Sequence, residues 1–162
     1  VYIHIMAEEL LRNEPHHALA PELATASCTC ASLRRTTRVV TKFYEDALKP
    51  SGLTPGQFTI LAVLLHRGGR RQSEISELLA MERTTLIRNL RPLEARGLIV
   101  GTASGPRHAK ILEITSDGKA AHEIALPHWQ SAQSKIIETL GTNRWSSLMR
   151  DLATTAESVQ SV

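Results

Sequence analysis

A polar and cationic stretch begins a predicted helix near the middle of the chain. Its candidate contact residues are Arg83, Thr84, Thr85 and Arg88. Such side chains can donate hydrogen bonds to base edges and phosphates when the first turns of a helix enter a major groove about 12 Å wide. Leucines at every third or fourth position would meanwhile face a core. The pattern predicts a DNA-contacting helix, and a solvated helix face is the alternative.

Further candidate contacts flank this helix. Gln72 and Ser73 open the preceding helix, where they could cap it, contact a phosphate, or do both. Arg107 lies in a hairpin tip from which it could reach the minor groove, whose negative potential attracts arginine, and Lys110 follows it. Residues 67–110 hold nine basic and four acidic side chains, whereas the whole chain has a net charge of +3. A basic middle is typical of a phosphate-facing module, and on charge alone also of a solvated surface.

The elements that would position these residues follow from local signals. Thr54-Pro55-Gly56-Gln57 can start a helix with a capping box, and Gly68-Gly69 ends it. Helices are predicted over residues 72–79 and 83–96, joined by a turn at residues 80–82. Two β-strands, at residues 98–100 and 109–114, flank turn residues. Helix, turn, helix and hairpin in this order predict a winged helix-turn-helix over residues 54–114.

Predicted helices flank this unit on both sides. Residues 1–30 form an arm or short helix, and residues 31–50 a helix with a broad apolar stripe that we expect to be buried. Residues 115–162 form further helices, with a kink expected at Pro127. The fold class is therefore mainly α with a small β-hairpin wing. The helices at both chain ends would form a dimerisation region.

Composition excludes several classes of protein. No apolar run approaches the roughly 18 residues needed to span a bilayer, and no signal peptide is recognisable, so we expect a cytoplasmic protein without membrane contact. We find no phosphate-binding loop, nucleophile elbow or carboxylate pair, and we therefore predict neither enzymatic activity nor a cofactor. His122 and His128 are six residues apart and do not share a helix face, so we expect neutral, solvent-facing histidines rather than a metal site.

Three segments together resemble the MarR family of bacterial transcription regulators. They read LTPGQFTILAVLL, then QSEISELLAMERTTLIRNLRPLEARGLI, then LEITSDG. The resemblance covers residues 31–160 and is most specific at RTT and LEARGLI. It implies a homodimer on pseudo-palindromic double-stranded DNA, often controlled by a small aromatic effector.

Four positions depart from the family pattern. Ala80 stands in the turn where glycine is usual, which suggests a slightly different turn. Ile87 replaces a common polar recognition residue and could touch a thymine methyl group or pack inside. Pro92 interrupts the recognition helix, where we expect a bend. Gly105 occupies the place of the aspartate that usually accompanies the wing arginine.

Cys30 suggests a redox alternative. In the peroxide-sensing OhrR branch, a reactive cysteine lies 24 residues before the threonine that opens the next helix, and Cys30 has the same spacing to Thr54. Tyr44 matches one thiolate-bonding tyrosine of that branch. The other two tyrosine positions hold Arg34 and Pro55, although Arg34 could lower the pKa of a thiol. An inert cysteine is the alternative.

The leading prediction is therefore a homodimeric, sequence-specific repressor released by a small aromatic ligand. Two alternatives stay open at this point. One is a repressor that senses peroxide through Cys30, and the other is a winged helix that binds proteins rather than DNA. A steep dependence of affinity on salt would favour DNA binding over the protein-interaction module.

Overall fold

The computed structural model describes residues 28–104 and 109–160. The chain divides into two units, of which the first ends at Phe43 and the second begins at Tyr44. Helix α3 (Thr29–Leu48) contains this boundary. The first half of the apolar stripe that we expected to be buried is exposed in the single chain: Leu33, Val39 and Val40 are 38%, 66% and 38% exposed. In its second half Phe43, Tyr44 and Ala47 are half-buried and Leu48 is buried.

The helix start predicted at Thr54 is confirmed. A 3-10 turn, η1 (Lys49–Ser51), leads to α4 (Pro55–Arg67). The Thr54 side chain accepts a hydrogen bond from the N–H of Gln57, whose own side chain accepts from the N–H of Thr54. This capping box satisfies two N–H groups that the helix cannot pair internally. The helix ends just before Gly68, as the sequence indicates.

The sheet has one strand more than the predicted hairpin. Strands β2 (Ile99–Ser104) and β3 (Ala109–Ile114) pair antiparallel, with Ile99 opposite Ile114. Strand β1 (Arg70–Arg71) pairs with the other edge of β3, which gives the order β1-β3-β2. A strand of two residues is too short to show a period of two in the sequence. Its pairing is tertiary and local signals could not reveal it.

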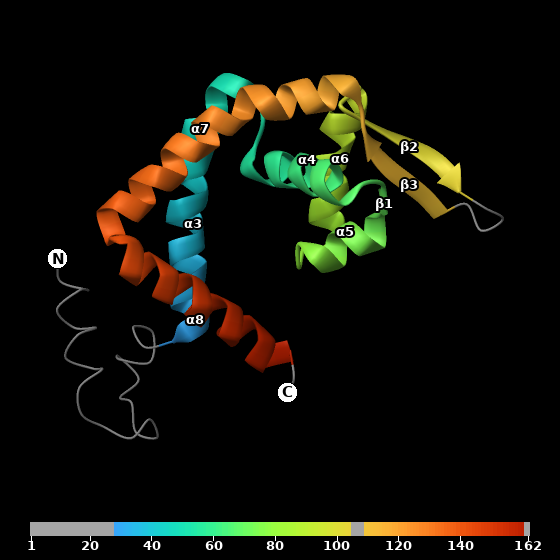
Figure 1. Ribbon diagram of the computed structural model, residues 1–162. Helices are drawn as coiled ribbons and strands as arrows, with labels where there is room; N and C mark the ends of the chain where they lie inside the picture. The colour runs from blue at the N-terminus through green and yellow to red at the C-terminus, as the bar shows by residue number, and fades with distance from the viewer. Residues whose placement is uncertain (1–27, 105–108, 161–162) are drawn as a thin grey trace, which may run out of the picture. The chain divides into compact units, whose positions relative to one another are not determined.

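Helices α5 (Gln72–Leu78) and α6 (Arg83–Ala95) complete the predicted helix-turn-helix. Figure 1 shows both beside α4, with the β2–β3 hairpin extending from this group. Their apolar faces meet in one core. Its most buried large side chains are Ile60, Leu61 and Leu64 of α4, Ile75 of α5, Leu86, Leu90 and Leu93 of α6, Leu112 of β3, and Leu48 at the end of α3.

Helix α7 (Ser116–Leu140) begins directly after β3 and packs on α4, and α8 (Thr142–Gln160) follows it (Figure 1). The Thr115 side chain caps α7 by accepting from the N–H of Gly118 at 3.0 Å. A Cβ atom at Gly118 would lie 2.0 Å from the Leu98 carbonyl oxygen, so only glycine permits this close approach. Helix α7 continues through Pro127, and a bend there stays a prediction. No described helix combines the length and apolar character needed to cross a bilayer.

Candidate nucleic-acid interface

Helix α5 is capped by residues other than the two that the sequence suggested. Arg71 occupies the N-cap position, and its N–H donates to Glu74 Oε2 at 2.7 Å. Gln72 and Ser73 are the first two residues of the helix, and their side chains make no hydrogen bond within the described residues. Capping is therefore not their role, and both side chains are available to a ligand.

The turn between α5 and α6 corrects our expectation of an altered turn. Ala80 has a φ of +45°, the left-handed conformation that glycine adopts without strain. The Ala80 N–H donates to the Glu77 carbonyl at 3.2 Å, and the Met81 N–H donates to the Ser76 carbonyl at 2.9 Å. These two bonds form a Schellman motif. Alanine thus adopts a left-handed conformation that favours glycine.

Helix α6 presents a cationic face to solvent. Arg83, Thr84 and Arg88 are exposed, whereas Thr85 is half-buried and Leu86 is buried. The Thr85 carbonyl accepts a hydrogen bond from Asn89 Nδ2 at 2.9 Å. Thr85 therefore lies at the edge of the exposed face. Ile87 is also half-buried. Its contact with a thymine methyl group, or its packing inside, stays a prediction.

Arg91 is a residue that the sequence reasoning missed. It is exposed and lies three residues after Arg88, which places the two about 60° apart around the helix. Helix α6 is not broken at Pro92 but runs on to Ala95; the expected bend stays a prediction. The spacing of Thr84, Arg88 and Arg91 at i, i+4 and i+7 was the available signal.

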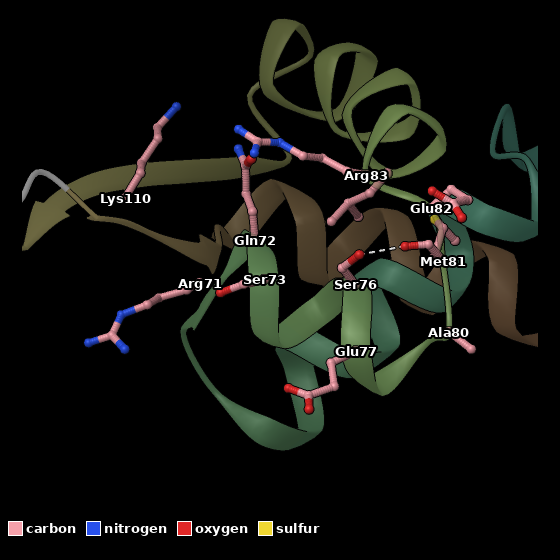
Figure 2. Close-up of a pocket in the computed structure, with 11 residues that line it drawn as sticks. Arg71, Gln72, Ser73, Ser76, Glu77, Ala80, Met81, Glu82, Arg83 and Lys110 are labelled. Carbon is pink, nitrogen blue, oxygen red and sulfur yellow. Dashed lines mark hydrogen bonds between the residues drawn. The ribbon is translucent and has the colours of Figure 1, made fainter. Parts of the chain in front are cut away.

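A hollow of about 900 Å³ lies where α5, the turn, α6 and β3 meet (Figure 2). Gln72 and Ser73 come from α5, Arg83 from α6 and Lys110 from β3. The lining residues are Arg71, Gln72, Ser73, Ser76, Glu77, Ala80, Met81, Glu82, Arg83, Leu86 and Lys110. Three of these are cationic and two anionic. Side chains from β1, α5, the turn, α6 and β3 therefore line one polar, net positive concavity.

The structure describes only some of the residues that we predicted in the wing. Arg107 and Gly105 lie outside the described residues. Lys110 is exposed in the outer part of the wing, and its Nζ forms an ion pair with Glu94 Oε1 on α6. Of the predicted contact residues that the structure describes, Gln72, Ser73, Arg83 and Lys110 share the hollow, whereas Thr84, Thr85 and Arg88 do not line it.

The redox candidates lie on α3. Cys30 and its neighbour Cys28 are free and exposed. Cys28 precedes the first helical residue, and its carbonyl accepts from the Ser32 N–H at 3.0 Å. The Tyr44 hydroxyl donates to Gln133 Oε1 at 2.7 Å, and burial raises the pKa of Tyr44. The phenol proton that a thiolate would need is thus already directed to an amide oxygen on α7.

His122 corrects a second expectation, because it is buried rather than solvent-facing. Its ring stacks on Phe58 with a centroid separation of 4.8 Å, and Phe58 in turn stacks on Trp129 at 5.8 Å. Burial lowers the pKa of His122, and the nearby His66 lowers it further, whereas Glu123 opposes the shift. The contact between α4 and α7 therefore favours the neutral form of the imidazole. No cluster of three metal-ligating side chains occurs among the described residues.

Comparison with known proteins shows similarity to transcription regulators. The chain is similar to the transcriptional regulator MosR of M. tuberculosis, with 35% identity and a TM-score of 0.77 over 86% of this chain and 100% of that one. The same regulator in complex with DNA matches at 34% identity and a TM-score of 0.75, over 83% and 98% of the two chains. None of the curated proteins matches the chain.

A second similar protein is the transcriptional repressor CouR bound to a 23-mer DNA duplex. It has 30% identity and a TM-score of 0.75, over 86% of this chain and 99% of that one. CouR is also known bound to p-coumaroyl-CoA, in a structure that is 29% identical to this chain. The MarR family profile matches residues 51–108, which contain the helix-turn-helix and the first wing strand. The chain thus belongs to the MarR family of transcription regulators.

Proposed function

We propose that the protein is a sequence-specific DNA-binding repressor that acts as a homodimer on a pseudo-palindromic operator. The exposed cationic face of α6 is the observation that carries the proposal. Arg83 and Arg88 are exposed there and form no ion pair within the described residues. MosR and CouR, which are similar to this chain, have both been solved with DNA. Such a regulator acts by binding DNA and not by catalysing a reaction. It would act in the cytoplasm, where it has access to the DNA.

The parts of the chain have distinct roles in this proposal. Residues 54–114 bind DNA, and residues 31–50 and 115–162 hold two copies together. The expectation of an arm or short helix at residues 1–30 lies outside the described residues, except that α3 already begins at Thr29. Exposed apolar side chains on α3 and α8 support the dimerisation role. The proposed DNA contacts are Gln72, Ser73, Arg83, Thr84, Thr85 and Arg88, together with Arg107, which is not described.

Substitution of Arg88 tests the proposal. Because a good arginine contact to a base contributes about 1–3 kcal/mol, we expect Arg88→Ala to weaken operator binding about five- to 150-fold. The thermal midpoint should stay nearly unchanged, since the side chain is exposed. The operator would first be selected from a random duplex pool.

Arg144→Ala provides a matched control, because this exposed arginine lies on α8 and its loss changes the net charge equally. Equal affinities of Arg88→Ala and the wild type would contradict the placement of the recognition helix. Binding that is insensitive to both salt and duplex sequence would instead favour a protein-interaction module.

We further propose that a small aromatic ligand releases the DNA. CouR, which is similar to this chain, has been solved with an aromatic acyl-CoA. A ligand can shift the dimer only by favouring the conformation with the wrong spacing of the two reading heads. Screening aromatic acids and their CoA thioesters for release of labelled operator would identify it. A failure of every compound of this class to release DNA would contradict the proposal.

A second regulatory mode rests on Cys30. The exposure of this free thiol makes it accessible to oxidants. If Cys30 senses peroxide, hydroperoxide treatment should release DNA from the wild type but not from Cys30→Ser. Wild-type binding that ignores peroxide would exclude this mode. The Tyr44 hydroxyl, which bonds to Gln133, would have to leave that partner to assist a thiolate.

A further inference from the structure

The outer part of the wing is joined to the recognition helix by one ion pair. Lys110 Nζ on β3 contacts Glu94 Oε1 near the end of α6, sixteen residues earlier in the chain. The two side chains are 46% and 31% exposed. It is the one ion pair that the described residues contain in the winged unit, and it connects the two elements that would face DNA.

The path of the lysine side chain depends on Gly101. In the antiparallel register Lys110 lies opposite Ala103, and Gly101 lies opposite Leu112. Lys110 and Gly101 are therefore diagonal neighbours on the same face of the hairpin. A Cβ atom at Gly101 would lie 1.8 Å from Lys110 Cε and 2.6 Å from Cδ. The lysine stem thus crosses strand β2 through space that any other residue would fill.

On this face of the hairpin, buried apolar side chains are followed by a charged side chain toward the tip. Ile99 and Leu112 are buried against the core, whereas Lys110 stands beyond them toward the tip. A two-stranded ribbon is only marginally stable without further packing. The buried contacts therefore fix the inner half of the wing, and the pair of Lys110 with Glu94 is the one hydrogen-bonded ion pair between the wing and α6 among the described residues.

We propose that Glu94 and Lys110 form a latch that positions the wing relative to α6, and that Gly101 is required for the lysine to reach Glu94. This inference rests on the proposed DNA-binding function. Lys110 then acts as a positioning residue rather than as a phosphate contact. Exposed ion pairs are weak, so the latch changes DNA discrimination about two- to five-fold and hardly affects folding.

The first test compares neutral variants. We expect Glu94→Gln and Lys110→Met each to lower the ratio of operator affinity to non-specific affinity about two- to five-fold, and the double variant to lower it no further. The ratio is measured at one salt concentration, so that changes in overall charge largely cancel. The salt slope of Lys110→Met should equal that of the wild type.

The exchanged pair, Glu94→Lys with Lys110→Glu, keeps the net charge and should restore the ratio. If Lys110→Met instead lowers the salt slope by about one and the exchanged pair is not restored, Lys110 is a phosphate contact and the latch is wrong.

A second test does not depend on DNA. Gly101→Ala should displace the Lys110 side chain, so its effect on Tm should be less favourable in the wild-type background than in the Lys110→Ala background, where the space is empty. Equal effects in both backgrounds would overturn the role of Gly101. If no duplex binds the wild type at all, the proposed function is wrong. The comparison of Tm between the two backgrounds would still show whether the lysine occupies the space over Gly101.

Discussion

Ala80 carries backbone strain in the turn that separates α5 from α6. Its φ of +45° is costly for a residue with a Cβ atom, by roughly 1–2 kcal/mol, whereas glycine loses about 0.5–1 kcal/mol more entropy on folding. We therefore expect Ala80→Gly to stabilise the fold by about 0.5–1 kcal/mol. Urea unfolding would show a higher midpoint with an unchanged m-value. Ala120→Gly, at an exposed position inside α7, is the control and should destabilise by a similar amount. A lower midpoint for Ala80→Gly would show that the turn is not strained.

His122 makes stability depend on pH. Burial and the neighbouring His66 lower the pKa of His122 below its ordinary value of 6.5, so the folded state favours the neutral ring. The unfolded chain binds a proton more readily, and stability must therefore decrease as the pH falls below about 6.5. Above that pH the contribution is complete. We expect the free energy of unfolding of the wild type to be lower at pH 5.5 than at pH 7.5.

The stacked geometry offers a matched variant for this pH effect. His122→Phe keeps an aromatic ring against Phe58 but cannot take up a proton, so its stability should change less between the two pH values. His128→Gln, on the same helix, is the control. A pH dependence that is identical in the wild type and in His122→Phe would show that His122 does not cause it.

At the scale of elements, the sequence predicted those parts whose signals are local. The capping box at Thr54 and the end of α6 near residue 96 depend on neighbouring residues only, and both are observed. The strand of Arg70 and Arg71 could not be predicted, because its partners on β3 lie 40 and 42 residues later in the chain. The predicted contact residues on α6 were readable because exposure follows the helical period. The ion pair between Lys110 and Glu94 could not be predicted, because it depends on the register of the hairpin and not on neighbouring residues.

The exposed face of α6 leads to a prediction for Arg91. Because this residue continues the face of Thr84 and Arg88 two turns into the helix, we expect it to contact a phosphate at the edge of the groove. Arg91→Ala should weaken binding to all duplexes alike and lower the salt slope by about one. Arg88→Ala should instead alter the sequence preference. A change in preference without a change in salt slope for Arg91→Ala would assign Arg91 to a base.

In the single chain, helix α8 leaves a row of apolar side chains exposed to solvent. Leu148, Leu152 and Val159 recur at intervals of four and seven residues, which places them on one face, and they are 41%, 39% and 71% exposed. A repeating apolar face of this kind normally packs against another element. A second copy of the chain supplies an identical face, and a two-fold dimer would pair like with like.

Dimerisation should in turn determine DNA affinity, because two linked reading heads bind neighbouring half-sites as one ligand. Leu152→Glu places a charge on the apolar face, and we expect it to yield monomers by light scattering at micromolar concentration. Loss of the second head should weaken operator binding by about 100-fold or more. Thr154→Glu, exposed two residues further on α8, is the matched control and should remain dimeric with full affinity. A Leu152→Glu protein that stays dimeric would show that the α8 face is not the interface. A monomer that binds the full operator as tightly as the wild type would show that one reading head is sufficient.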